Sequence, residues 1–223
     1  MRGSGNTGSV QVMAIAAGWL LAATAVADNG ALSFAPYALQ TQKHGVIDAE
    51  VAWLRVPQRH ANPAGPTQVL RVVRLKAVDG SGGHAPVVYL AGGPGGSGVG
   101  TARGDRWPVF DQVRQQTDVL LLDQRGTGDS QPAPACPYDA GLEDTKPLQR
   151  DAALAALQAQ AARCTGWWQQ QGVDLAGYTS QESADDIGAL RRALGVPRIS
   201  LWGMSYGSHL ALATLRRQGD GIE

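Results

Sequence analysis

One short motif constrains the fold of this chain more than any other feature of its sequence. Ser205 is the centre of Gly203-Met204-Ser205-Tyr206-Gly207, directly after the apolar run 199–202 and before a run with helical periodicity. A strand, this motif and a helix form a turn that holds the serine in strained geometry and lifts its Oγ out of the backbone. We therefore predict that Ser205 is a nucleophile and that the tight turn requires residues as small as Gly203 and Gly207 on either side of it. An ordinary turn between a strand and a helix is the alternative.

A glycine-rich segment, residues 91–98, follows the apolar run 86–90. Glycines let a substrate approach the backbone closely, so that backbone amides can act as hydrogen-bond donors. Beside such a serine, an oxyanion hole uses the amide of the following residue and one amide from an upstream loop. We assign these two donors to Tyr206 and Gly93, and expect three further residues to shape the loop: Gly92, Pro94 and Gly95. A dinucleotide-binding loop is the alternative, disfavoured because Pro94 interrupts the segment and no helix is expected promptly after it.

A third motif, residues 123–130, follows the apolar run 118–122. It begins with Asp123 and Arg125, whose opposite charges suit an ion pair. We predict that these two side chains pair and brace the loops around Ser205, and we prefer this structural role over a direct part in catalysis.

The order of apolar runs predicts an α/β fold. Two short and largely apolar runs, 86–90 and 118–122, suit strands of a sheet that helices cover on both faces, and a further strand is expected at 198–202. Residues 50–56 and 67–78 alternate instead and suit an opening antiparallel pair. Helices are expected at 107–116, at 151–168, after a capping box formed by Thr179 and Glu182, and at 206–217. The expected architecture is a largely parallel sheet with flanking helices.

The first residues have the pattern of an export signal. Arg2 precedes a mostly apolar run, residues 12–23, and Ala25-Val26-Ala27 provides a small-x-small cleavage site. We predict a signal peptide at 1–27, cleaved after Ala27, and a periplasmic or secreted domain at 28–223. An uncleaved anchor or a buried helix is the alternative, but the run is shorter than the about 20 residues of a membrane span.

Export changes the interpretation of the two cysteines. Cys136 and Cys164 are an even pair, which favours a disulfide in an oxidising compartment, with two buried thiols as the alternative. The sequence holds no Cys-x-x-Cys and no Cys/His cluster, so neither a metal nor another cofactor is predicted. Nineteen Lys and Arg balance nineteen Asp and Glu, which argues against binding nucleic acid or a membrane surface through bulk charge.

Three blocks, 90–98, 118–130 and 203–212, occur in an order and at a spacing that resemble the proline iminopeptidase and tripeptidyl aminopeptidase family of α/β-hydrolases. Many members of that family carry a histidine where this chain has Ala91, a departure shared with tripeptidyl-aminopeptidase-like members. The resemblance implies release of N-terminal residues from short peptides through an acyl-enzyme on Ser205. An esterase or lipase acting on small esters is the alternative, and the oligomeric state is left open.

The histidine base and the acid of the catalytic triad are not evident. In the family that the chain resembles, both follow the serine, as the order Ser, Asp/Glu, His of this architecture requires. Three histidines, at 44, 60 and 84, precede Ser205, and His209 lies only four positions after it. Asp220 and Glu223 are the only acids after Ser205. We therefore expect the N-terminal part of a hydrolase domain, truncated after the nucleophile strand and helix, without the cap and the C-terminal strands. An inactive fragment is a further alternative.

Overall fold

The computed structural model describes residues 31–78, 80, 84–132, 135–142 and 149–223. The expected signal peptide, residues 1–27, lies outside this range. The described chain forms six strands: β1 (Ala35–Gln40), β2 (Val46–Pro57), β3 (Thr67–Leu75), β4 (Val87–Leu90), β5 (Val119–Leu122) and β6 (Ser200–Gly203). Five α-helices accompany them: α1 (Gly98–Arg103), α2 (Trp107–Val113), α3 (Arg150–Gln170), α4 (Ser180–Leu194) and α5 (Tyr206–Gln218). Two short 3-10 helices, η1 (Leu175–Gly177) and η2 (Gly219–Gly221), complete the described elements.

The six strands form one mixed sheet in the order β1-β2-β3-β5-β4-β6. The first three strands pair antiparallel, as predicted for β2 and β3, and β3 also runs antiparallel to β5. Only β5, β4 and β6 run parallel, because helical crossovers connect them. The sheet is therefore less parallel than the sequence predicted. Strand β1 was not predicted, since only Leu39 among its residues is fully buried.

The order in which the chain places its parallel strands in the sheet reverses at β4. It moves from β4 to β5 on one side and then returns to place β6 on the other side of β4. In open α/β sheets, ligands bind at the carboxyl ends of the strands where the order reverses in this way. The carboxyl end of β4 leads into the glycine-rich segment and that of β6 into Ser205. The topology therefore brings the two predicted parts of the site to one edge of the sheet.

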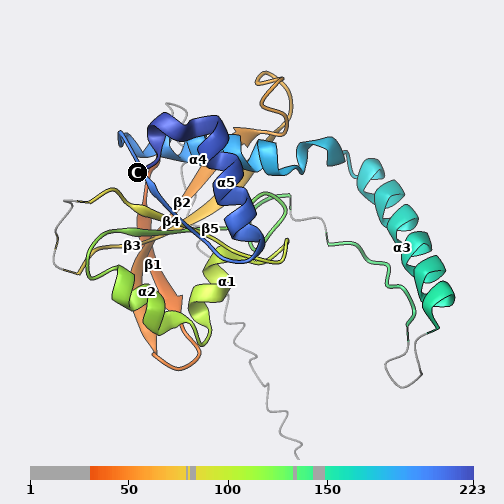
Figure 1. Ribbon diagram of the computed structural model, residues 1–223, viewed down its shortest axis with the longest axis horizontal. Helices are drawn as coiled ribbons and strands as arrows, with labels where there is room; N and C mark the ends of the chain where they lie inside the picture. The colour runs from red at the N-terminus through yellow and green to blue at the C-terminus, as the bar shows by residue number, and fades with distance from the viewer. Residues whose placement is uncertain (1–30, 79, 81–83, 133–134, 143–148) are drawn as a thin grey trace, which may run out of the picture.

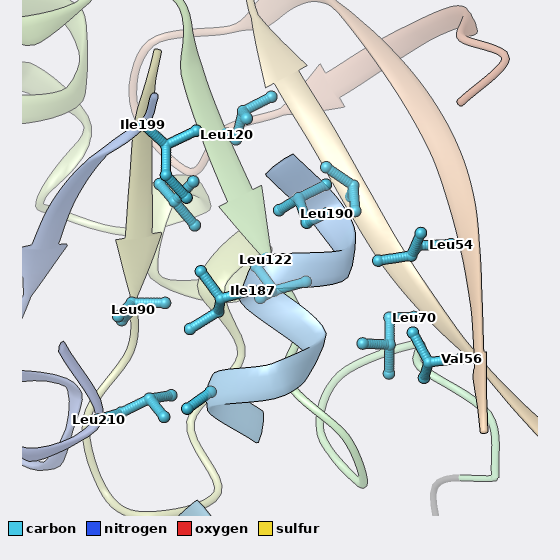
Figure 2. Close-up of a cluster of buried hydrophobic side chains, with 13 residues drawn as sticks. Leu54, Val56, Leu70, Leu90, Leu120, Leu122, Ile187, Leu190, Ile199 and Leu210 are labelled. Carbon is cyan, nitrogen blue, oxygen red and sulfur yellow. The ribbon is translucent and has the colours of Figure 1, made fainter. Parts of the chain in front are cut away.

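Helices cover both faces of the sheet (Figure 1). On one face, α4 and α5 pack over a cluster that includes Leu90, Leu122, Ile187 and Leu210, all of them almost fully buried (Figure 2). On the other face, α1 and α2 cover a second cluster, in which the rings of Tyr89, Phe110 and Trp202 lie with centroids 4.8 Å apart. Burial on both faces explains why β4 and β5 are apolar throughout.

Helix α3 extends away from the sheet (Figure 1). Only Ala153 and Cys164 are buried along its length. The predicted disulfide is present between Cys136 and Cys164, whose Cα atoms are 5.5 Å apart, and it ties the helix to the segment that precedes it. No helix within the described ranges combines the length and apolarity needed to cross a membrane.

Candidate active site

Ser205 has the strained backbone that the motif predicted. Its φ of 53° and ψ of −120° make it the one non-glycine residue with positive φ among those that the structure describes. The turn is closed by a hydrogen bond of 2.8 Å that the Gly207 N–H donates to the Met204 carbonyl. The side chain of Ser205 is exposed, and its hydroxyl forms no hydrogen bond with any other described residue. The turn therefore presents a free Oγ at the carboxyl end of β6.

The two glycines of the motif are required by close backbone contacts. A Cβ atom on Gly207 would lie 2.7 Å from the carbonyl carbon of Leu90, inside van der Waals contact. A Cβ on Gly203 would lie 2.6 Å from the carbonyl carbon of Gly207. The missing side chains thus let the start of α5 pack directly against the end of β4, which fixes the position of Ser205.

The glycine-rich loop lies against this turn. A Cβ on Gly92 would be 2.9 Å from both the Met204 carbonyl oxygen and the Ser205 Cβ. Gly93 follows in a conformation with φ of 117° that L-residues rarely adopt, and it is exposed together with Pro94 and Gly95. No described group accepts a hydrogen bond from the N–H of Gly93 or Tyr206. These unpaired donors beside Ser205 suit the two predicted oxyanion contacts, which stay a prediction.

Asp123 and Arg125 do not pair with each other, contrary to the sequence prediction. The buried carboxylate of Asp123 instead joins the loops after β4 and β5. It accepts hydrogen bonds from the Ser97 hydroxyl at 2.6 Å, the Val99 N–H at 3.2 Å and the Asp129 N–H at 3.2 Å. Ser97 in turn caps α1, a helix that begins directly after the glycine-rich segment, so the expectation that no helix follows promptly was wrong.

Arg125 pairs with Asp186 of α4, and each side chain is only 1% exposed. The Nε and Nη2 atoms of Arg125 each lie 2.6 Å from a carboxylate oxygen of Asp186. The Nη1 atom donates to the carbonyls of Gln58 and Gly177. A guanidinium buried this deeply requires hydrogen-bond acceptors for its five donors and an opposite charge, and Asp186 provides that charge.

Asp186 is the partner of Arg125 that the sequence prediction missed. It occupies the same helical face as Ile187 and Leu190, and an acid on a buried face requires a cation nearby. That signal was readable in the sequence, although the identity of the cation was not. The Glu182 carboxylate next to it accepts from the His60 N–H at 2.8 Å, while Thr179 caps α4 as predicted.

None of the four histidines, all of which the structure describes, forms a hydrogen bond with Ser205. His60 Nε2 lies 2.8 Å from Asp186 Oδ1, His44 sits in the turn between β1 and β2, and His84 lines a cavity near the amino ends of β4 and β6. The His209 ring lies beside the ring of Tyr206 with centroids 5.8 Å apart. The backbone of Glu223 bonds to Ile199, at the opposite end of β6 from Ser205. The described residues thus present an exposed serine hydroxyl and free amide donors, and none of their histidines is hydrogen-bonded to that serine.

The strain at Ser205 has a measurable cost. A non-glycine residue in such a region costs about 1–3 kcal/mol, whereas glycine occupies it without a Cβ clash. We expect Ser205→Gly to be about 1 kcal/mol more stable than Ser205→Ala, because both variants lose the hydroxyl and only alanine keeps the strain. Urea unfolding of the two variants measures the difference. Equal stability, or a more stable alanine variant, would show that the backbone at Ser205 is relaxed.

Comparisons with known proteins show the family of the chain. Residues 85–222 match the family model described as the alpha/beta hydrolase fold. The chain is 29% identical over 174 residues to the tripeptidyl aminopeptidase of Streptomyces lividans, a match that covers 72% of this chain and 31% of the relative. It is 29% identical over 167 residues to the serine protease Hip1 of Mycobacterium tuberculosis, covering 72% of this chain and 32% of Hip1.

The chain therefore spans about a third of the length of these curated relatives. Among solved structures, a proline iminopeptidase-related protein of Thermus thermophilus aligns with a TM-score of 0.43 at 19% identity, over 85% of this chain and 42% of that protein. Because the family model covers more than half of the sequence, the conclusion on family is direct. The chain belongs to the alpha/beta hydrolase fold family.

Proposed function

We propose that this chain carries the nucleophile of an exported serine aminopeptidase, which releases N-terminal residues from peptides through an acyl-enzyme on Ser205. One observation carries the proposal: Ser205 is exposed at positive φ, beside the unpaired N–H donors of Tyr206 and Gly93. The similarity to a tripeptidyl aminopeptidase and to a serine protease supports a peptide substrate.

The chemistry follows from this arrangement. The Ser205 Oγ attacks the carbonyl carbon of the substrate and loses its proton to a base, while the carbonyl electron pair moves onto the oxygen. The N–H groups of Tyr206 and Gly93 stabilise that developing charge, and removal of one such donor costs roughly 3–4 kcal/mol in other enzymes. The protonated base then donates that proton to the nitrogen of the leaving amine as the tetrahedral adduct collapses. This leaves an ester on Ser205, which water hydrolyses with the help of the same base.

We further propose that the base and its orienting acid come from outside the described residues. The observation behind this step is the placement of the histidines, each held by other contacts or far from the carboxyl end of β6. A second observation is that β6 pairs along its length with β4 alone among the described strands, leaving one apolar strand edge open to further pairing. The curated relatives are also about three times longer than the matched region.

Export rests on two features. Residues 1–27 have the sequence pattern of a cleavable signal, and the disulfide between Cys136 and Cys164 suits an oxidising compartment. We propose a periplasmic or secreted location on this basis.

Acylation of Ser205 tests the proposed substrate class. We expect the p-nitrophenyl ester of a tripeptide with a free amino terminus to acylate the chain at least about 10-fold faster than p-nitrophenyl acetate, because the peptide gains contacts that acetate lacks. Imidazole is supplied in both reactions as a diffusible base, and intact-protein mass spectrometry follows the adduct.

Ser205→Ala is the matched control and should form no adduct. Faster acylation by acetate or butyrate esters than by the peptide ester would favour the alternative, an esterase that uses the same turn and loop. An adduct of equal yield in Ser205→Ala would remove Ser205 from the mechanism.

A further inference from the structure

A cavity of about 290 Å³ lies next to the turn at residues 203–207 that holds Ser205. Its wall includes Pro94 and Gly95 of the glycine-rich loop and Tyr206, the residue after the nucleophile. The opposite wall comes from the segment between β5 and α4, with Trp168, Leu175 and Tyr178. A larger cavity of 510 Å³ opens at the amino ends of β4, β5 and β6 and is therefore remote from Ser205. The smaller cavity is the one that shares residues with the predicted oxyanion site.

The wall of this cavity carries no unpaired charge. Arg125 is its one charged lining residue, and the bidentate contact with Asp186 neutralises it. Burial raises the pKa of the Tyr178 hydroxyl, against the lesser opposing effect of the Arg125 charge, so Tyr178 stays neutral at neutral pH. Moving a charged side chain into such a space would cost its hydration without a compensating partner. The cavity therefore favours an uncharged group.

The size of the cavity suits one side chain. Pockets that hold a whole drug-sized ligand have volumes of about 300–1,000 Å³, so this cavity is at or below the lower limit. The lining combines rings and a leucine with the polar groups of Gln124, Thr127 and Ser183. An apolar side chain in the cavity can contact the rings and the leucine.

The position of the cavity assigns the group to the acyl side of the substrate. If the amides of Gly93 and Tyr206 hold the carbonyl oxygen, the attacked carbonyl lies beside this cavity. The reason is that Pro94, Gly95 and Tyr206 line the cavity and include or directly follow those two donors. The two groups attached to the attacked carbonyl, the acyl substituent and the leaving group, are the parts of the substrate nearest to this wall, and we assign the acyl substituent to it.

On these grounds we propose that the cavity between Pro94, Tyr206 and Leu175 is the specificity pocket for an uncharged apolar side chain on the residue whose carbonyl Ser205 attacks. This inference rests on the proposed function, because it takes Ser205 as the nucleophile. It also makes the segment between β5 and α4 a determinant of specificity, since that segment provides Trp168, Leu175 and Tyr178.

The test compares tripeptide p-nitrophenyl esters that differ only in the residue bearing the ester. With imidazole as base, we expect the leucyl and phenylalanyl esters to acylate Ser205 at least about 10-fold faster than the glutamyl ester. Leu175→Trp fills the cavity and should abolish this preference. Leu157→Trp, at a leucine of α3 that is 48% exposed and outside the cavity, is the matched control and should keep it.

A binding measurement separates failure of the pocket from failure of the proposed function. We expect the tripeptide amide ending in leucine to shift the NMR signals of Thr127 and Leu175, and the glutamate analogue to leave them in place. These shifts do not depend on a reactive Ser205. Shifts without acylation would support the pocket and contradict the nucleophile.

If Leu175→Trp is acylated at Ser205 with the same preference for apolar over glutamyl esters as the unchanged chain, the cavity is not the specificity pocket. Ser205 would still be the nucleophile in that case. A preference that follows the leaving group while remaining insensitive to the acyl residue would overturn the pocket in the same way.

Discussion

Gly207→Ala is expected to destabilise the protein by about 3 kcal/mol or more, at or above the upper end of the usual cost of overpacking. The added Cβ would lie 2.7 Å from the Leu90 carbonyl carbon and closer still to the carbonyl oxygen, so one backbone would have to move away from the other. Neither can move easily, because β4 is the central parallel strand and α5 packs on it. Urea unfolding followed by circular dichroism measures the loss.

Gly166→Ala is the matched control for this substitution. Gly166 lies inside α3, and no atom outside its own helix lies within 4 Å of a Cβ placed there. Alanine should therefore stabilise the helix, by roughly 0.5–1 kcal/mol. Opposite signs for the two substitutions would tie the cost at Gly207 to the contact with Leu90. A Gly207→Ala variant as stable as the unchanged chain would contradict the close packing of Gly207 against the backbone of Leu90.

Asp186→Ala is expected to cost about 3 kcal/mol, because it removes the bidentate partner of the buried Arg125 guanidinium and leaves only the Glu182 carboxylate, 3.9 Å from Nη1, as a counter-charge. Both side chains are 1% exposed, so water cannot replace the lost carboxylate without opening the structure. The loss should also loosen the loop after β5, since Arg125 connects that loop to α4 and to the carbonyls of Gln58 and Gly177. Thermal unfolding measures the loss of stability.

Two further variants test whether the buried charge of Arg125 causes the loss of stability in Asp186→Ala. Asp185→Ala removes the neighbouring acid, whose partner Arg217 is 45% exposed, and should cost no more than about 1 kcal/mol. The double variant Arg125→Met/Asp186→Leu removes both charges and should recover most of the stability lost in Asp186→Ala. A small loss in Asp186→Ala, equal to that in Asp185→Ala, would mean that Arg125 finds solvent or another partner.

The strained turn at Ser205 could be predicted from the sequence because its geometry is local. Five consecutive residues determine both the positive φ at Ser205 and the absence of side chains at Gly203 and Gly207. The crossovers from β4 to β5 and from β5 to β6 were likewise predictable, since short runs apolar on both faces signal parallel strands. These features brought the glycine-rich loop and Ser205 to one edge of the sheet.

The contacts that brace the site could not be predicted, because they join distant residues. Arg125 has an acid two positions before it in the sequence, and yet it pairs with Asp186, which is 61 positions away. Asp123 accepts hydrogen bonds from Ser97, the residue that caps α1, and from Val99 within α1, so its carboxylate is stabilised without Arg125. The wall provided by Trp168, Leu175 and Tyr178 has no periodic signature, since it combines the end of α3 with η1 and the residue after it.

Acylation of Ser205 with and without added imidazole tests most directly whether the described chain holds a nucleophile that lacks its base. Without imidazole, we expect the tripeptide ester to modify Ser205 only slowly. With imidazole, we expect an acyl-enzyme to form at a rate that rises with the concentration of neutral imidazole. Ser205→Ala should remain unmodified in both conditions. Rapid acylation and turnover without imidazole would show that a residue of this chain already serves as the base, and would contradict our central claim.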